Sequence, residues 1–195
     1  MIERYTLKEM GNVWEEKNRY SKWLEVEIAA CEGMKEYGLI PKEAVGNIKK
    51  KAKIDLGRIH AFEKINNHEV IAFLDSLTEM IGNDARYIHL GLTSSDIMDT
   101  GLALQMKDAG GIILKDIDAL RKFLKKQALK YKNTVMIGRT HGIHAQPITL
   151  GLKFALWWEE MERNRERFKK AIETISYGKI SGAVGTYTHT SPELE

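Results

Sequence analysis

Residues 150–175 carry apolar side chains alternately four and three positions apart. This spacing is typical of a helix whose apolar seam packs along parallel or antiparallel partner helices. The seam consists of Leu150, Phe154, Trp157, Met161, the polar interruption Asn164, Phe168, Ala171 and Ile175. The sequence therefore predicts that this helix belongs to a bundle.

A second long helical pattern covers residues 97–131 and contains Gly110-Gly111. Two consecutive glycines favour a kink or a domain boundary at that point. No strong strand pattern occurs, and residues 134–137 are the one candidate for a short extended piece. Alternating strands and helices are thus excluded as the basis of the fold.

The expected fold is all-α: a small helical amino-terminal domain (residues 1–111), followed by the first long helices of a truncated bundle domain (residues 112–195). A chain of 195 residues with 43% hydrophobic and 29% charged residues can bury a real core and resembles soluble globular proteins. The lone Cys31 excludes an internal disulfide and favours a cytoplasmic location, and we expect it to be a buried, inert thiol. No apolar run approaches the length of a membrane span.

The net charge of +3 permits acidic ligands such as phosphates and carboxylates. Two basic stretches, residues 49–51 and 163–170, lack the interleaved aromatic residues that stack on bases. We interpret both as solvated helix faces and expect no nucleic-acid partner and no membrane partner.

Four shorter helices are expected before residue 82. Their boundary residues are Asn12 and Gly38 for the first, Pro41 for the second, Asp55 for the third, and Asn66 or Asn67 with Gly82 for the fourth. The first helix should bury Trp23, Val26, Ala30, Met34 and Tyr37. His68 is expected in the first turn of the fourth helix, where unpaired N–H groups disfavour a charged ring and attract anions.

Polar side chains gather between the two long helical patterns, in residues 138–147. His141 and His144 lie on this glycine-hinged connection with Arg139, and Pro147 suits the first position of the helix that follows. Titratable side chains on such a connection favour a functional site over a spacer.

Two further features point to anion binding. The hydroxyls of Thr93, Ser94 and Ser95, with Asp96 as a cap, precede a helix expected to begin at Ile97, and His89 is nearby. Near the amino terminus, Arg4-Tyr5 offers a guanidinium fork and a hydroxyl to a phosphate. The alternative for all of these is ordinary capping and polar packing in the loops of a bundle.

Several other chemistries fit poorly. His141 and His144 are three positions apart, but no Cys or carboxylate accompanies them, so a metal site is not expected. Residues 178–185 are glycine-rich but lack the closing Gly-Lys-Ser/Thr of a phosphate-binding loop. Serine-hydrolase spacing is absent as well. Acid–base chemistry on a bound anion remains, with a structural scaffold as the competing interpretation.

The chain resembles the fumarase/aspartase superfamily, and within it the branch that acts on adenylosuccinate. The motifs that carry the resemblance are Gly138-Arg139-Thr140-His141-Gly142-Ile143-His144-Ala145-Gln146-Pro147, Leu92-Thr93-Ser94-Ser95-Asp96, Asp99-Thr100, Arg4-Tyr5, Asn67-His68-Glu69 and Lys179-Ile180-Ser181-Gly182-Ala183-Val184-Gly185. They cover essentially the whole chain in order and spacing. Related enzymes that cleave argininosuccinate or fumarate share the Gly-Arg-Thr-His core without the second histidine.

This resemblance implies elimination of fumarate from adenylosuccinate to give AMP, and from the succinyl-carboxamide ribotide of purine synthesis, with no cofactor or metal. It implies His141 as the proton donor and His68 as a second catalytic histidine near the substrate phosphate. The substrate-binding residues that it implies are Arg4, Tyr5, Asn67, His68, Glu69, His89, Thr93 and Ser94. Glu69 replaces the family's usual Asp, and Gln146 stands where this branch often has Glu.

The resemblance also implies that residues 1–195 are the front part of a homotetrameric enzyme. The family's serine-bearing loop, which supplies the expected base, would follow residue 195, and Thr190–Glu193 resembles the start of another helix. The 195-residue chain alone is therefore expected to be inactive. The alternatives are a non-catalytic helical module that binds a nucleotide or partner helices, and a lyase or cycloisomerase for another dicarboxylate.

Overall fold

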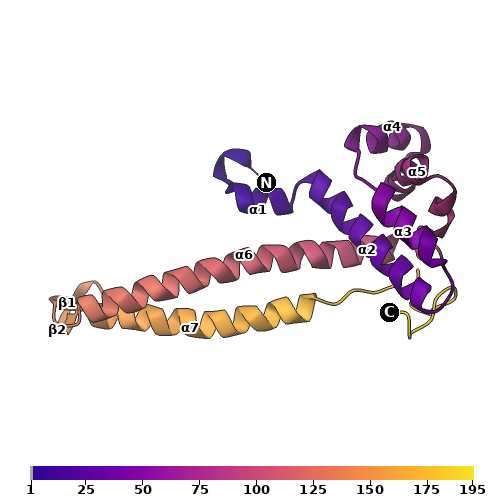
Figure 1. Cartoon of the computed structure of the whole chain (residues 1–195). Coiled ribbons are helices and arrows are strands. Elements are labelled where there is room, and N and C mark those ends of the chain that lie inside the picture. The colour runs from indigo at the N-terminus through magenta and orange to yellow at the C-terminus, as the bar shows by residue number, and fades with distance from the viewer. Residues whose placement is uncertain (1) are drawn as a thin grey trace. The chain divides into compact units, whose positions relative to one another are not determined.

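The computed structural model describes residues 2–195 and is predominantly helical, as predicted (Figure 1). A short β-hairpin, β1–β2, is the one departure from an all-α fold within these residues. The elements are η1 (Glu3–Tyr5), α1 (Lys8–Val13), α2 (Glu16–Glu36), α3 (Lys42–Lys51), α4 (Leu56–Asn66), α5 (Glu69–Ile81), η2 (Asn83–Tyr87), α6 (Ser94–Lys130), β1 (Val135–Thr140), β2 (Ile143–Thr149) and α7 (Leu150–Ile175).

The chain forms two compact units. Unit 1 comprises Met1–Met106 together with Ser176–Glu195, and unit 2 comprises Lys107–Ile175. The long helix α6 contributes its first turns to unit 1 and the remainder to unit 2. The division into domains at residues 1–111 and 112–195 stays a prediction.

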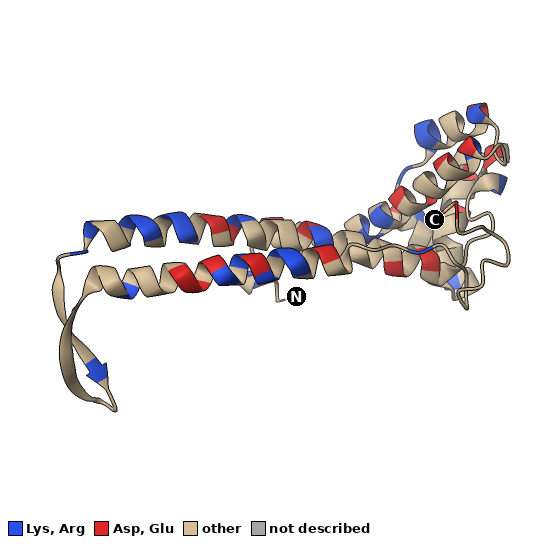
Figure 2. Cartoon of the chain, turned by 90° about the horizontal axis from the view of Figure 1, so that it is seen from below, with Lys and Arg blue, Asp and Glu red and all other residues tan. Residues whose placement is uncertain are grey.

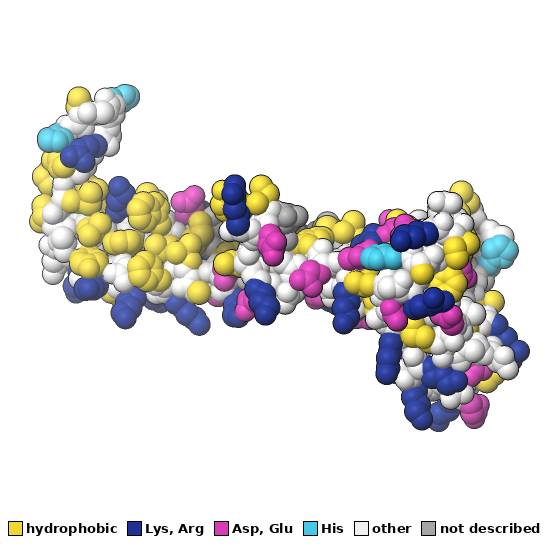
Figure 3. All heavy atoms as spheres, turned by 90° about the horizontal axis from the view of Figure 1, so that it is seen from above, with side chains coloured by type: hydrophobic (Ala, Val, Ile, Leu, Met, Phe, Trp, Pro, Cys, Tyr) yellow, Lys and Arg dark blue, Asp and Glu magenta, His cyan; other side chains and the backbone are white. Residues whose placement is uncertain are grey.

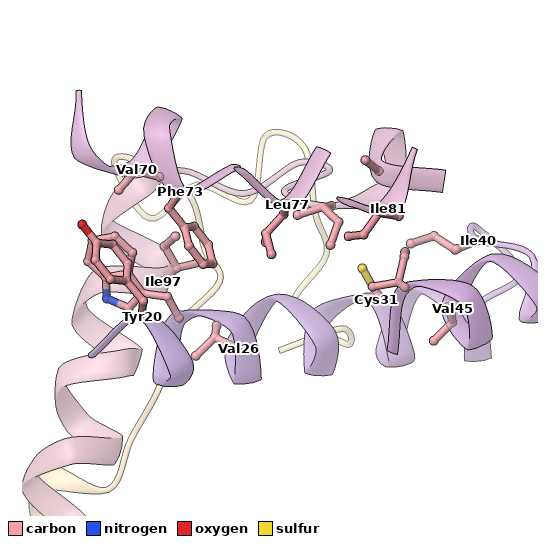
Figure 4. Packing of buried hydrophobic residues seen from close by; sticks show 14 of the residues in the cluster. Tyr20, Val26, Cys31, Ile40, Val45, Val70, Phe73, Leu77, Ile81 and Ile97 are labelled. Carbon is pink, nitrogen blue, oxygen red and sulfur yellow. The ribbon is translucent and has the colours of Figure 1, made fainter. Parts of the chain in front are cut away.

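The core of unit 1 is built around three aromatic rings from α2 and α5. Tyr20 and Phe73 stack with their ring centroids 5.8 Å apart, and Trp23 meets both rings edge-on. Figure 4 shows the aliphatic side chains that continue this core along α2, α5 and α6. The predicted inward face of α2 is confirmed except at Tyr37, which is 55% exposed. Because α2 ends at Glu36, Tyr37 leaves the helical face as the C-cap residue.

Helix starts were predicted with mixed success. Asp55 caps α4 by accepting the Arg58 backbone N–H at 3.1 Å, and Pro41 directly precedes α3, as expected. The prediction that Asn12 begins the first long helix is wrong, because residues 8–13 form the separate helix α1. The chain turns after Val13, and α2 starts at Glu16 without a side-chain cap.

Residues 176–195 return to unit 1 and pack on its surface. The Tyr37 hydroxyl donates to the Glu193 carbonyl at 2.8 Å, and the side chain of Leu194 packs beside Gly33. Thr100 of α6 exchanges hydrogen bonds with the backbone N–H and carbonyl of Lys179. The expected helix start near Ser191 is not followed by a helix within residue 195. This segment therefore ties α2 to the start of α6.

In unit 2, α6 runs through Gly110 and Gly111 as one unbroken helix. A side chain at Gly110 would have its Cβ 2.7 Å from Ile172 of α7. Gly110 thus allows α6 and α7 to approach closely, and α6 is not broken at this position. Ala171 was predicted to lie in the apolar seam of α7, and this prediction is wrong. Ala171 is exposed, and the half-buried Ile172 packs against α6 instead.

α7 runs back along the second half of α6, so the predicted helical partner is present (Figure 1). Two ion-pair contacts join the helices: Arg165 Nε lies 2.6 Å from Asp118, and Arg121 binds Glu162. Figure 2 shows that charged residues of both signs cover this helix pair. Arg165 was expected on a solvated face, but it points to α6, and its guanidinium lowers the pKa of Asp118.

The hairpin end of unit 2 exposes hydrophobic side chains. Leu152 and Leu156 of α7 are 59% and 63% exposed, and Phe123 of α6 is 54% exposed. Figure 3 shows hydrophobic atoms gathered over this end, below the histidines of the hairpin. Large apolar patches of this kind are typical of surfaces that pack against other protein.

Because of Cys31, the free energy of unfolding should depend on pH in the alkaline range. The thiol is 1% exposed, as predicted for a buried cysteine, and burial followed by the charges of Glu27 and Glu32 raises its pKa from 9.0 to about 12. Between these pH values the unfolded thiol ionises while the folded thiol stays neutral. The free energy of unfolding should therefore fall by up to about 1.4 kcal/mol per pH unit in this window.

Urea denaturation at several pH values above neutrality measures this slope. Cys31→Ala should have a shallower slope, although Tyr20, whose pKa is also raised by burial and by Glu69, keeps part of the dependence. Equal slopes for Cys31→Ala and the unmodified chain would show that the thiol does not contribute.

Candidate active site

The hairpin β1–β2 presents the histidine-bearing stretch. Its antiparallel register pairs Arg139 with His144 and Thr140 with Ile143, which leaves His141 and Gly142 as a two-residue turn. Both have positive φ, 53° and 75°, as a type I′ hairpin turn requires. Most such turns use Asn or Asp before Gly, so histidine occupies a strained position here.

Pro147 was predicted to open a helix, and this prediction is wrong. Pro147 lies in β2 opposite Ile137, next to an irregularity in the register, and α7 begins only at Leu150. Strands tolerate proline at edges and bulges, where its missing N–H breaks no ladder bond. Thr149 starts α7 instead, because its hydroxyl accepts the Leu152 N–H at 3.1 Å.

The polar side chains of the hairpin face solvent. Arg139, Thr140, His141 and His144 are all exposed. The backbones of the two strands approach closely at Gly138, where a Cβ would lie 2.7 Å from the Gln146 carbonyl oxygen. A rigid two-stranded turn thus holds the His141 ring at its tip, accessible to a ligand or a reacting group.

In unit 1, His68 is the N-cap of α5 itself, whereas Asn66 or Asn67 was expected in this role. The His68 Nδ1 accepts the Ile71 backbone N–H at 3.3 Å, so the ring proton of this conformation is on Nε2. Asn67 ends α4 in the left-handed region at φ 51°, and Asn66 accepts the His68 N–H. The two asparagines form the turn, and His68 offers an exposed Nε2–H.

Glu69 follows His68 and points back to α2. Its carboxylate forms an ion pair with Arg19 and accepts the Tyr20 hydroxyl at 3.3 Å. The carboxyl that stands where the family usually has Asp thus links α5 to the aromatic core. These bonds fix the start of α5, on which His68 depends.

His89 forms a second histidine site with Glu27 of α2. Its Nδ1 lies 2.5 Å from Glu27 Oε1, and its backbone N–H donates to Glu27 Oε2 at 2.8 Å. The Glu27 side chain is completely buried, whereas that of His89 is 19% exposed. His89 also has a left-handed backbone, with φ 61°.

The hydroxyl-rich turn begins α6 three residues earlier than expected. The helix starts at Ser94, and the Asp96 carboxylate accepts the Thr93 N–H at 2.9 Å, as in a capping box. The buried Asp96 also pairs with Lys179 Nζ at 2.6 Å, and this ammonium donates to Ser95 Oγ at 3.1 Å. Asp96 and Lys179 therefore form a connected polar cluster that fixes the start of α6 beside Thr93 and Ser94.

Arg4 and Tyr5 lie in the exposed turn η1. The Arg4 guanidinium packs over the Tyr5 ring, 4.8 Å from its centroid, and Tyr5 is 73% exposed. Among residues 2–195, no hydrogen bond in the structure joins these side chains to the histidines of unit 1. Both groups remain available to a ligand.

The expected site residues thus fall into two sets. His141 belongs to unit 2, and the others belong to unit 1, where α5, α6 and the segments before them carry His68, His89, Thr93 and Ser94. Sequence reasoning missed Glu27 and the pairing of Lys179 with Asp96. Glu27 interrupts the apolar stripe of α2, and a lone acidic residue at such a position is a usable signal.

A metal-binding cluster is not found in the part of the chain that the structure describes: residues 2–195 contain no group of three or more His, Cys, Asp or Glu side chains that could hold an ion. None of the helices in that range is long and apolar enough to cross a bilayer.

Curated relatives match the full length of the chain. Adenylosuccinate lyases of Aquifex aeolicus (strain VF5) and Bacillus subtilis (strain 168) are each 50% identical to it, over 198 and 195 residues respectively. These matches cover 100% of this chain and 45% of each relative. The chain therefore spans less than half the length of the curated relatives that it matches.

Solved structures agree in fold. Fumarate lyase from Mesorhizobium sp. BNC1 has a TM-score of 0.88 at 28% identity, covering 95% of this chain and 45% of that one. The 3-carboxy-cis,cis-muconate lactonizing enzyme from Pseudomonas putida has a TM-score of 0.86 at 32% identity, covering 95% and 44%. The sequence pattern of the family described as Lyase matches residues 3–195. With nearly every residue inside that match, the chain belongs to the lyase family, which confirms the kinship inferred from its motifs.

Proposed function

We propose that this chain supplies the proton-donating part of an adenylosuccinate lyase, which splits adenylosuccinate into AMP and fumarate. The same site would act on the succinyl-carboxamide ribotide of purine biosynthesis. The observation that carries the proposal is 50% identity to adenylosuccinate lyases over the whole chain, including the turn that bears His141.

The elimination needs two proton transfers. A base removes a proton from the carbon beside a carboxylate, the C–N bond breaks, and an acid protonates the departing nitrogen. We assign the acid to His141, because its ring is exposed at the tip of a rigid turn and an imidazole can donate a proton to a departing nitrogen. We place the base outside residues 1–195, on a serine-bearing loop.

The remaining residues would hold the substrate's negative groups. Thr93 and Ser94 bind the succinyl carboxylates at the start of α6. The phosphate region is bound by Arg4 and Tyr5, with the exposed Nε2–H of His68 close to it. His68 is also the second catalytic histidine.

Three other residues complete the substrate pocket in this proposal. His89 lines it beside Thr93, Asn67 shapes the turn before His68, and Glu69 holds the start of α5 in place. We further propose that the enzyme is a cytoplasmic homotetramer, and the exposed hydrophobic side chains of unit 2 would pack against other subunits.

A second candidate is a lyase or cycloisomerase for another dicarboxylate. Its supporting observation is the TM-score of 0.86 to a muconate lactonizing enzyme at 32% identity. The two candidates differ at the phosphate site, because a simple dicarboxylate has no phosphate group for Arg4 to bind. Activity that is insensitive to Arg4→Ala would favour this second candidate.

The isolated 195-residue chain should not release fumarate from adenylosuccinate above background, because it carries the acid without its base. Calorimetric titration of this chain with AMP separates a retained half-site from a purely structural helical module. Binding that Arg4→Ala abolishes supports a half-site, whereas a folded chain that does not bind AMP supports the module. Turnover by the isolated chain would disprove the division of acid and base.

Catalysis can be followed in a hybrid enzyme, in which residues 1–195 replace the matching 45% of the Bacillus subtilis relative. The two segments are 50% identical, and the remainder of the relative would supply the base. All kinetic variants below refer to this hybrid enzyme.

A further inference from the structure

The Glu27 carboxylate is completely buried, and both of its oxygens bind one residue. Oε1 lies 2.5 Å from the His89 Nδ1, and Oε2 accepts the His89 backbone N–H at 2.8 Å. A carboxylate removed from water requires hydrogen bonds and a compensating charge. The His89 ring provides both when it is protonated.

Because Glu27 is hydrogen-bonded to both the ring and the backbone of His89, it fixes the orientation of the ring. His89 adopts a left-handed backbone, φ 61°, that a non-glycine residue rarely takes without support. Because Nδ1 is occupied by Glu27, only Nε2 is left to meet a ligand. The His89 side chain is 19% exposed, so its ring is not fully buried.

The chain around His89 leads directly to the expected carboxylate-binding turn. The His89 carbonyl accepts the Leu92 N–H at 3.3 Å, Gly91 turns the chain at φ 74°, and Thr93 follows. On the other side of Thr93, Lys179 neutralises the buried Asp96, and the buried Glu27 is hydrogen-bonded to the His89 ring.

We propose that Glu27 is a positioning residue that holds His89 as a fixed Nε2–H donor to a negatively charged group of the substrate. This rests on the proposed function, because it takes His89 to be part of the substrate pocket. Glu27 itself is buried and acts only through His89.

The state of the ring can be tested in the 195-residue chain by nitrogen-15 NMR of its histidines at neutral pH, with the His89 signals assigned by their loss in His89→Gln. Both ring nitrogens of His89 should be protonated. Glu27→Gln should convert the signals to those of a neutral ring. The matched control is Glu32→Gln, on the same helix, which removes a surface pair with Lys49. Unchanged His89 signals in a folded Glu27→Gln chain would overturn the proposal.

The effect on the substrate can be measured in the hybrid enzyme. Glu27→Gln should raise KM for adenylosuccinate about tenfold or more, by analogy with the residues that orient metal-ligating histidines, and should change kcat less. In a His89→Gln background, Glu27→Gln should have no further effect on KM. Independent, additive effects of the two substitutions on KM would contradict the proposal.

The experiments distinguish an error in the proposed function from an error in the role of Glu27. A folded hybrid enzyme that ignores adenylosuccinate would reject that function, and the NMR comparison would still decide whether Glu27 controls the His89 ring.

Discussion

Replacing His141 with Asn in the hybrid enzyme is expected to lower kcat by about 10²–10⁴-fold, with KM changed by less than about threefold. His141 is proposed to protonate the departing nitrogen, an interaction that is made only as the C–N bond breaks. Loss of such an interaction lowers kcat and kcat/KM together. Asparagine has no group that titrates near neutrality, so it cannot supply the proton.

The choice of Asn separates chemistry from backbone strain. His141 has φ 53°, a left-handed conformation that Asn adopts readily and Ala does not. His141→Ala should therefore lose activity and also loosen the turn, whereas His141→Asn should keep the turn. The matched control is His60→Gln, an exposed histidine of α4 paired with Glu16. A kcat near normal in His141→Asn would remove His141 from the mechanism.

Replacing Lys179 with Met is expected to lower the free energy of unfolding by about 2–3 kcal/mol. The Asp96 carboxylate is completely buried, and Lys179 Nζ is its cationic partner at 2.6 Å. Removing one member of a buried pair typically costs 3–5 kcal/mol, and we take a lower value because the Lys179 side chain is 34% exposed and solvent screens part of the pair. The pair also ties the carboxyl-terminal segment to α6.

Urea denaturation of the 195-residue chain measures this loss. The double variant Lys179→Met/Asp96→Asn should recover part of it, because no buried charge is then left unpaired. Lys169→Met is the control, since it breaks only an exposed pair with Glu166 and should cost less than about 0.5 kcal/mol. If Lys179→Met and Lys169→Met had equal effects, the Asp96–Lys179 pair would not be a main support of unit 1.

The helical fold was predictable because its signals are periodic. The apolar faces of α2, α5 and α7 repeat at helical spacing, and Gly38 and Gly82 follow the helix ends as expected. Errors occurred where the deciding contact is distant in sequence. Gly110-Gly111 was predicted to be a kink or a domain boundary, but α6 continues through both residues, and Gly110 lies against Ile172 of α7, a contact that local propensity does not reveal.

The extended piece predicted at residues 134–137 overlaps β1, but the second strand and the hairpin were missed because their residues are poor hairpin formers. A two-residue turn of His141-Gly142 lacks the usual Asn or Asp, and Pro147 argued against a strand. Antiparallel pairing between the ends of two packed long helices overrides these local preferences. The unfavourable turn is therefore where function and local propensity disagree, as is common at sites.

The sequence pointed to the polar residues at turns that make up the candidate site, but it did not point to the side chains that support them. Thr93, Ser94 and the histidines stand out because polar groups gather at turns. Their supports, Glu27 for His89 and Lys179 for Asp96, come from segments 62 and 83 positions away. Pairings of this length follow from the tertiary fold, and no spacing rule reveals them.

The central claim is tested most directly by the wild-type hybrid enzyme and its kcat/KM for adenylosuccinate. We predict release of fumarate and AMP in equal amounts, at a rate that falls by about 10²-fold or more in His141→Asn. A folded hybrid enzyme that leaves adenylosuccinate intact, or one whose activity does not depend on His141, would contradict the claim that this chain carries the acid of an adenylosuccinate lyase.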